Sequence, residues 1–208
     1  MSAPAWERTL DVRTADETHA LAAGLGAQLR AGDLLVLTGE LGAGKTTFTQ
    51  GLGEGLGVRA GIISPTFVLV RIHPNLPDGP RPGGPDLVHV DAYRLGSAAE
   101  IDDIDLENTM DSAVTVVEWG RGRVEHLSDS RLEVDLHRSV GGTLASELGA
   151  EAGSPEAAHD PGVLDFDTDD DDEPRTIVIR GFGPRWVEPP ALREPAGHET
   201  RPYTLEEN

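Results

Sequence analysis

Short stretches of apolar residues, or of apolar residues alternating with polar ones, predict the strands of one sheet. The unbroken apolar run at 34–37 is typical of a parallel strand that is buried on both faces. Residues 131–137 alternate apolar and polar side chains, as an edge strand does. Together these patterns place strands at 9–13, 34–37, 67–72, 86–91, 114–119, 131–137 and 176–179.

Two longer segments have the helical spacing of apolar residues, with one apolar face each. The first begins at a capping box, Thr14-Ala15-Asp16-Glu17, and Gly32 can end it. The second follows a glycine-rich stretch, and Gly57 can close it. Shorter helices are expected at 97–103 and 121–127. The apolar faces consist of Leu21, Leu25 and Leu29 in the first helix and of Phe48, Leu52 and Leu56 in the second.

Two stretches break these patterns. Residues 74–85 hold five prolines and three glycines, which predicts a loop that connects a hairpin. Residues 139–174 hold eleven Asp or Glu and no Lys or Arg, more than half of the formal charge of −20. This acidic segment has too few large apolar groups to offset the entropy of ordering, so we expect a disordered insertion. The prediction is one domain over 1–186, interrupted by 139–174, with a loose tail over 187–208.

The glycine-rich stretch carries the most specific chemical signal in the chain. Residues 39–46 read Gly-Glu-Leu-Gly-Ala-Gly-Lys-Thr and match G-x-x-x-x-G-K-[ST]. In such a loop consecutive backbone N–H groups converge on an anion, and the N-terminus of the following helix adds partial positive charge. Lys45 would reach the β- and γ-phosphates of a nucleotide, and the Thr46 hydroxyl would ligate Mg²⁺. Lys45 is also the only lysine in the chain, which suggests that a compact ammonium is required there.

Strand, phosphate loop and helix follow one another in the order that a nucleotide-binding domain needs. We therefore predict an α/β fold, a P-loop NTPase-like three-layer arrangement with a central, largely parallel (mixed) sheet and edge hairpins. Within the loop, nucleotide contacts are expected from Glu40, Leu41, Gly42, Ala43, Gly44, Lys45, Thr46 and Thr47.

Two predicted strands end in a carboxylate. Asp91 closes strand 86–91, where a Mg²⁺-positioning Asp of a phosphate-loop fold belongs, although a strand-terminal Asp can also cap the next turn. Glu118 lies at the end of strand 114–119 and is the candidate to orient or deprotonate the attacking water. The alternative for Glu118 is a solvated carboxylate at a strand end.

Four further residues have two interpretations each. Thr66, in Ser-Pro-Thr-Phe, is either a switch residue that senses the γ-phosphate or part of an ordinary turn. Trp119 lines the nucleotide pocket or anchors the core, and Arg94 contacts phosphate or pairs with an acid. His89 is interpreted as a packed structural histidine rather than a metal ligand.

Composition excludes several classes of function. The chain has no cysteine, which excludes disulfides and thiolate chemistry. Its acidic balance argues against direct binding of DNA or RNA, because that interaction needs clustered Lys and Arg. The N-terminus lacks the basic and apolar regions of an export signal, and no apolar run is long enough to span a bilayer. We therefore expect a cytoplasmic protein with no membrane partner.

Four motifs, in this order and spacing, resemble the bacterial TsaE (YjeE) family. They are Gly-Glu-Leu-Gly-Ala-Gly-Lys-Thr-Thr at 39–47, Ser-Pro-Thr-Phe at 64–67, His-Val-Asp-Ala-Tyr-Arg-Leu at 89–95 and Val-Glu-Trp-Gly at 117–120. The resemblance covers roughly residues 9–137. The proline-rich loop and the acidic segment depart from the compact family pattern, and no family function is carried onto them.

The resemblance implies a small ATPase that supports threonylcarbamoyladenosine modification of tRNA, at the adenosine next to the anticodon. It implies that the protein binds ATP or ADP with Mg²⁺ and joins TsaD and TsaB, where the transfer chemistry belongs to TsaD. Contact with tRNA would be indirect, through this complex. In the expected phosphoryl transfer to water, Lys45 holds phosphates, Thr46 and Asp91 place Mg²⁺, Thr66 senses the γ-phosphate and Glu118 positions water.

Other functions remain as alternatives at this point. A phosphate-loop kinase would need an acceptor pocket and a mobile arginine-bearing lid, for which Arg121 and Arg123 are the only nearby pair. A GTPase is disfavoured because the guanine-reading Asn-Lys-x-Asp needs a second lysine. The non-enzyme alternative is a nucleotide-gated assembly subunit, in which ATP binding alone builds the complex.

Overall fold

The computed structural model describes residues 3–95, 97, 100–101, 106–138 and 173–192. Most residues of the acidic segment, of the predicted helix at 97–103 and of the tail therefore lie outside the described residues. Seven strands form one sheet in the order β1-β7-β6-β2-β5-β4-β3. The strands are β1 (Trp6–Val12), β2 (Leu34–Gly39), β3 (Val70–His73), β4 (Asp86–Asp91), β5 (Ala113–Glu118), β6 (Arg131–Arg138) and β7 (Arg175–Phe182).

The centre of the sheet is parallel and its margins are antiparallel. Strand β2 pairs in parallel with both β5 and β6, and β4 pairs in parallel with β5. Strands β3 and β4 form the hairpin that the proline-rich loop connects, while β7 pairs antiparallel with β6 and β1. The predicted α/β class, with a mixed sheet and hairpins at its margins, is confirmed.

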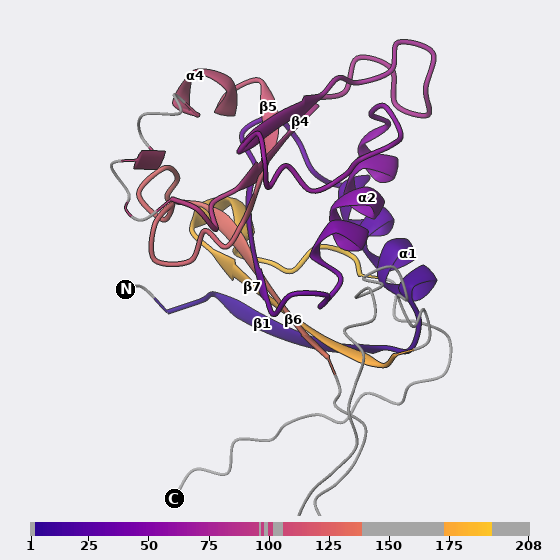
Figure 1. Cartoon of the computed structure of the whole chain (residues 1–208), viewed down its shortest axis with the longest axis vertical. Coiled ribbons are helices and arrows are strands. Elements are labelled where there is room, and N and C mark those ends of the chain that lie inside the picture. Colours follow the sequence, from indigo (N-terminus) through magenta and orange to yellow (C-terminus); the bar gives the residue numbers. More distant parts are fainter. Residues whose placement is uncertain (1–2, 96, 98–99, 102–105, 139–172, 193–208) are drawn as a thin grey trace, which may run out of the picture.

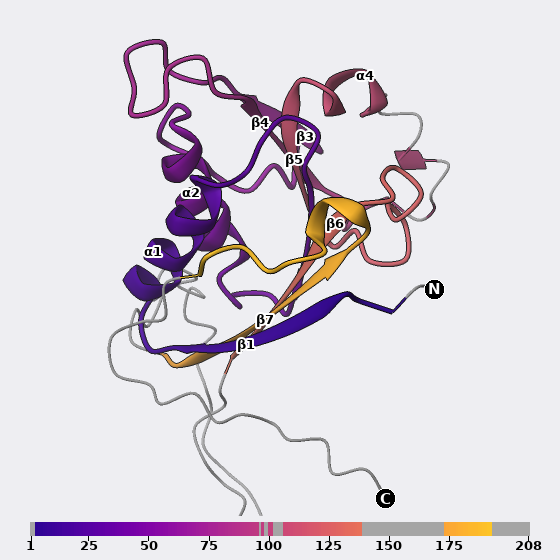
Figure 2. The ribbon, with the colours of Figure 1, turned by 180° about the vertical axis from the view of Figure 1, so that it is seen from behind.

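Helices α1 (Ala15–Gly26) and α2 (Lys45–Leu56) lie side by side against one face of the sheet, and the short helix α4 (Glu107–Met110) lies on the other side (Figures 1 and 2). Strand β2 contributes to both cores, because Leu35 and Leu37 pack in the cluster with α1 and α2 while Leu34 and Val36 pack in the other cluster. The unbroken apolar run therefore does mark a strand that is buried on both faces.

Both main helices begin where the sequence predicts. The Glu17 N–H donates to the Thr14 hydroxyl at 3.1 Å, and the Glu17 carboxylate accepts from the Arg13 N–H at 2.7 Å. Helix α2 ends at Gly57, which has φ of 73°. Helix α1, however, ends at Gly26 and not at Gly32, because the N–H groups of Gln28 and Leu29 turn back to carbonyls only three residues earlier.

One predicted helix is wrong, one predicted strand begins later than expected, and one helix was not predicted. Residues 121–127 form successive turns rather than a helix, because Gly122 has φ of 78° and breaks the helical path. The strand predicted at 67–72 starts only at Val70, since the N–H groups of Val68 and Leu69 both turn back to the Pro65 carbonyl. The sequence patterns did not predict α4.

Strand β6 is not an edge strand, because β2 and β7 flank it. Its polar residues are mostly buried and pair with arginines on the same or neighbouring segments. Arg131 bonds Glu133 at 2.8 Å, and Arg180 bonds Asp135 at 2.5 Å. The alternation that suggested an exposed face thus comes from charge pairs. A short 3₁₀ helix, η1 (Pro184–Trp186), follows β7 and buries Trp186 in the core.

Candidate functional site

The phosphate loop connects β2 to α2 with its glycines in the conformation that an anion cradle needs. Gly42 and Gly44 have φ of 76° and 94°, a region that other residues rarely adopt. Gly44 caps α2 without any side-chain hydrogen bond. The first amides of α2 consequently have no side-chain acceptor within the described part of the chain, and they remain available to an anion.

Lys45 is buried within this loop. Its Nζ donates to the carbonyl oxygens of Gly39 and Glu40, at 2.9 Å each. It also lies 4.2 Å from the centroid of the Trp119 ring, within cation–π range. Burial lowers the pKa of the Lys45 ammonium, while the carboxylates of Glu118 and Asp91 act in the opposite direction. The ammonium is thus held at the mouth of the loop, between its own backbone and two acids.

Asp91 ends β4 and is almost fully buried. Its Oδ2 accepts from the Thr66 hydroxyl at 2.6 Å, and that hydroxyl lies 2.7 Å from the Ser64 hydroxyl. The other oxygen, Oδ1, accepts from the Tyr93 N–H at 2.9 Å. Asp91 therefore caps the next turn and also lines the cavity beside the phosphate loop, while its role in placing Mg²⁺ stays a prediction.

Glu118 ends β5 directly beside Asp91, because these two residues are register partners in the parallel pair. It is only 3% exposed, which rules out the solvated carboxylate considered above. Its Oε1 lies 2.8 Å from Nε2 of His89, a residue that is itself fully buried. His89 is a packed histidine, as predicted, but its hydrogen bond to Glu118 was not foreseen.

A second histidine lies behind this pair. The rings of His73 and His89 are 6.3 Å apart, centroid to centroid. Burial lowers the pKa of His73, and the nearby charges of His89 and Arg71 lower it further. We therefore expect His73 to be neutral near pH 7.

Trp119 lines the site and does not anchor the core. It is half-buried, with its ring 5.5 Å from that of Tyr93 in an edge-on arrangement, and Trp186 is the fully buried tryptophan. The φ of Trp119 is 61°, an uncommon value for a residue with a side chain. Such strain is often retained at functional positions, and here it follows immediately after Glu118.

One cavity of about 300 Å³ brings most of the predicted residues together. Glu40 and Ala43 are not among its lining residues, since Glu40 is exposed and Ala43 is buried in the core. Sequence reasoning did not select Ala15, Ser64 and Arg175, which also line it. The predicted residues that line the cavity are Leu41, Gly42, Gly44, Lys45, Thr46, Thr47, Thr66, Asp91, Glu118 and Trp119.

The arginines considered for other roles have different neighbours. Arg94 lies over the Phe67 ring, 5.3 Å from its centroid. Arg121 pairs with Asp135 and Glu133, and Arg123 donates to the Ala92 carbonyl at 2.6 Å. Because both members of the possible kinase lid are tied to the body of the domain, their contacts give that alternative no support.

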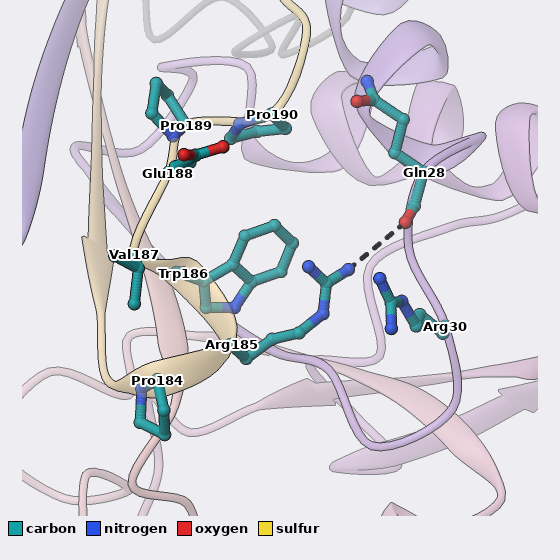
Figure 3. Close-up of a pocket in the computed structure, with 9 residues that line it drawn as sticks. All are labelled: Gln28, Arg30, Pro184, Arg185, Trp186, Val187, Glu188, Pro189 and Pro190. Carbon is teal, nitrogen blue, oxygen red and sulfur yellow. Dashed lines mark hydrogen bonds between the residues drawn. The ribbon is translucent and has the colours of Figure 1, made fainter.

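A larger cavity, of about 480 Å³, lies at the opposite end of β7 around η1 (Figure 3). The Arg185 guanidinium crosses it, bonding Asp33 at 3.1 Å and the Gln28 carbonyl at 3.4 Å. The Arg185 guanidinium is thus already paired, and this larger cavity contains no residue of the phosphate loop. We assign the chemistry to the smaller cavity.

The described residues contain no cluster of three or more His, Asp or Glu placed to hold a metal ion. A Mg²⁺ that is bound with phosphates needs only one or two carboxylates, so the single Asp91 suffices for such an ion.

None of the helices in the described residues has the length and apolar character to cross a membrane.

Comparison with known proteins places this fold and site in a family. The model of the family described as threonylcarbamoyl adenosine biosynthesis protein TsaE matches residues 12–143. The tRNA threonylcarbamoyladenosine biosynthesis protein TsaE of Streptomyces coelicolor is 47% identical over 160 residues, covering 76% of this chain and 86% of that protein. The protein of the same name from Bacillus subtilis is 39% identical over 125 residues, covering 60% and 73%.

A solved structure agrees with these sequence matches. The crystal structure of Bacillus subtilis YdiB superposes with a TM-score of 0.57 at 27% identity, covering 89% of this chain and 92% of that one. The fold is thus shared across nearly the whole of both chains, and the family match includes the phosphate loop, Thr66, Asp91 and Glu118. The chain therefore belongs to the TsaE family of threonylcarbamoyl adenosine biosynthesis proteins.

Proposed function

We propose that this protein is a Mg²⁺-dependent ATPase that supports threonylcarbamoyladenosine modification of tRNA together with TsaD and TsaB. The observation that carries the proposal is the cavity that joins the phosphate loop, Asp91 and Glu118. It contains a phosphate cradle, oxygen donors for a hard cation and a buried carboxylate, which are the parts that phosphoryl transfer to water needs. The tRNA modification in this proposal is inferred from membership of the TsaE family.

Phosphate binding falls to the loop amides and to Lys45. The N–H groups at the start of α2 point at the anion, and the helix dipole adds to their field. Lys45 now uses the carbonyls of Gly39 and Glu40 as acceptors. In our proposal it exchanges these for β- and γ-phosphate oxygens, with little movement of its buried stem.

The residues present fit a Mg²⁺ site. Thr46 and Asp91 both line the cavity and offer a hydroxyl and a carboxylate, the oxygen ligands that Mg²⁺ prefers. Bound Mg²⁺ would neutralise charge on the phosphoryl oxygens during transfer. Thr66 already donates to Asp91, so its hydroxyl orients this carboxylate, and in our proposal it also senses the γ-phosphate.

Glu118 is the residue that we assign to the attacking water. It faces the same cavity as Lys45, and the hydrogen bond with His89 holds one of its oxygens in place. A fixed, buried carboxylate can orient a water molecule and accept its proton as the bond to phosphorus forms. The phosphate loop, Asp91 and Glu118 lie at one end of three parallel strands, β2, β4 and β5, which supports this assignment.

The partners TsaD and TsaB are part of the proposal, with tRNA contacted only through them. The formal charge of −20 supports an indirect role, because a strongly acidic chain is repelled by the tRNA backbone. A cytoplasmic location, which the sequence analysis expects, belongs to the same proposal, because the tRNA to be modified is there.

The test is hydrolysis of ATP and of GTP by the purified protein with Mg²⁺, alone and with TsaD and TsaB from the same source. We expect ATP to be preferred and its hydrolysis to rise with the partners. Lys45→Ala should lower the rate about a hundredfold or more, because it removes the charge that faces the transferred phosphate. Lys45→Arg should fail to restore it, because a forked guanidinium does not replace a compact ammonium there.

Two outcomes would contradict the proposal. Unchanged hydrolysis in Lys45→Ala would show that the phosphate loop is not the active site. Tight ATP binding without hydrolysis, in the presence of both partners, would instead support the nucleotide-gated assembly subunit. A faster loss of ATP with a small-molecule acceptor, and a phosphorylated product, would support the kinase.

A further inference from the structure

Arg175 lines the phosphate-loop cavity although no motif includes it. It is the first residue of β7, and its side chain passes against the loop at Gly44. A Cβ placed on Gly44 would lie 3.4 Å from Nε of Arg175 and 3.5 Å from its Cδ. The side chain of Arg175 therefore lies directly beside the loop glycine.

Within the described residues, the guanidinium of Arg175 lacks the partners that its burial calls for. The residue is only 6% exposed, and its Nε–H has no hydrogen-bond partner in the described part of the chain. Its Nη1 donates to the Glu173 carbonyl at 3.2 Å, which is a neutral acceptor. Burying a charge is costly unless an opposite charge and hydrogen bonds compensate for it, so an anion is the ligand that this group suits.

A second buried arginine shows the usual arrangement. Arg131, which is 8% exposed, bonds the Glu133 carboxylate at 2.8 Å and lies over the Phe182 ring. No carboxylate among the described residues lies within ion-pair distance of Arg175. Arg131 and Arg175 are buried alike, so burial does not explain why only Arg131 has a carboxylate partner among the described residues.

The sheet order tells which part of a nucleotide lies near Arg175. Strands β5 and β4 lie on one side of β2 and carry Glu118 and Asp91, while β6 and β7 lie on the other side. If the γ-phosphate lies toward the two carboxylates, the α-phosphate and the nucleoside lie toward β7. Ala15, at the start of α1, lines the cavity as well and comes from the segment that follows β1, the neighbour of β7.

We propose that Arg175 binds the α-phosphate of the nucleotide through its unpartnered Nε–H, on the side of the phosphate loop opposite Asp91 and Glu118. The proposal rests on the proposed function, in that it takes the loop to bind a nucleotide. It assigns Arg175 to nucleotide affinity and not to the transfer step, because the α-phosphate is not the group that moves.

The experiment is calorimetric titration of ADP and of ATP into the full-length protein and its Arg175→Gln and Arg175→Lys variants, with Mg²⁺. A charge-assisted hydrogen bond predicts a dissociation constant about tenfold or more weaker for Arg175→Gln, equally for ADP and ATP. Arg175→Lys should recover little of this loss, because an ammonium cannot place a donor at Nε. Thermal unfolding of each variant checks that β7 still pairs.

Arg138→Gln is the matched control, since Arg138 is the register partner of Arg175 across β6 and β7. Its guanidinium already pairs with the Glu173 carboxylate, with Nε donating at 2.7 Å. We expect an affinity within about threefold of the wild type, as for an exposed ion pair. Equal losses in Arg138→Gln and Arg175→Gln would overturn the proposal, because general electrostatics would then suffice.

The remaining outcomes separate this inference from the proposed function. If the wild-type protein binds ADP and Arg175→Gln binds it equally well, the role of Arg175 is refuted and the proposed function stands. A loss confined to ATP would also refute it, because that pattern belongs to a γ-phosphate contact. If the wild-type protein binds neither nucleotide, the proposed function itself fails.

Discussion

On the β4–β5 side of the phosphate loop each carboxylate is already held by a neighbouring side chain, whereas on the β6–β7 side the buried Arg175 has no carboxylate partner among the described residues. Thr66 donates to Asp91, and His89 bonds Glu118. These hydrogen bonds fix the carboxylates before any ligand arrives. The Arg175 guanidinium opposite them is positioned by its burial and by the hydrogen bond of its Nη1, but no carboxylate of the described residues neutralises it.

The difference teaches how one loop can separate binding from chemistry. Groups that must hold a precise position for proton transfer gain from hydrogen bonds within the protein, because preorganisation costs nothing at the moment of reaction. A group that serves affinity gains more from staying unpaired, since the ligand then supplies its missing partner. Lys45 combines features of both kinds of group, because its ammonium is held within the protein, but by backbone carbonyls that a phosphate can replace.

The largest expected effect comes from Glu118→Gln, on the side that we assign to chemistry. This change keeps size and polarity but removes the negative charge that accepts a proton. We expect ATP hydrolysis to fall about 100- to 10,000-fold, as for loss of a general base, with ADP affinity within about threefold of the wild type. Turnover with TsaD and TsaB present, together with calorimetry of ADP, measures both quantities.

Glu118→Gln also tests the non-enzyme alternative. If hydrolysis disappears while tRNA modification by the complex continues at its normal rate, ATP binding alone is enough for function. Unchanged hydrolysis would show that another residue handles the water. A loss of ADP affinity as large as that of Arg175→Gln would contradict the division between a β4–β5 side for chemistry and a β6–β7 side for affinity.

A smaller effect is expected when His89 is changed, because it acts on the reaction only through Glu118. His89→Leu removes the hydrogen bond at 2.8 Å and leaves a buried carboxylate without this partner. We expect turnover to fall about ten- to a hundredfold without a change in the KM for ATP. His89→Gln, whose amide can donate, should recover part of the rate.

His73→Gln is the control for His89. His73 is buried and close, but no bond links it to Glu118, and its Nε2 has no partner in the described residues. We expect turnover within about twofold of the wild type. An equal loss in His73→Gln and His89→Leu would mean that packing of this region, and not the bond to Glu118, controls the rate.

The sequence predicted those parts of the fold that depend on local patterns. Strand β2, the phosphate loop and α2 were predicted in order, because each is specified by residues that are adjacent in the chain. Strand β6 was misassigned to an edge, since Glu133 and Asp135 look like solvent-facing residues until their arginine partners are known. Periodicity reports polarity along a strand, but it cannot report which neighbours neutralise it.

The same limit applies to the site. Asp91 and Glu118 could be predicted because parallel strands that flank a phosphate loop end at one edge of the sheet, where both do meet. The bond from His89 to Glu118 depends on the register of two strands. Arg175 reaches the loop only because β7 returns antiparallel along β6, after the long acidic segment. No local pattern distinguishes Arg175 from the other fifteen arginines.

The smallest effect sharpens the comparison most, because it asks which end of the nucleotide each side of the loop contacts. Thr66→Val removes the hydroxyl that donates to Asp91 at 2.6 Å and keeps the shape of the side chain. If Thr66 senses the γ-phosphate, ATP affinity falls about two- to tenfold, the value of one hydrogen bond, while ADP affinity stays unchanged. Ser64→Ala, which removes only the neighbouring hydroxyl, should change neither affinity.

Arg175→Gln is expected to weaken the affinities for ATP and ADP equally. The ratio of ATP to ADP affinity in these variants therefore locates each contact along the phosphate chain. Equal losses of ATP and ADP affinity in Thr66→Val would show that Thr66 does not report on the γ-phosphate.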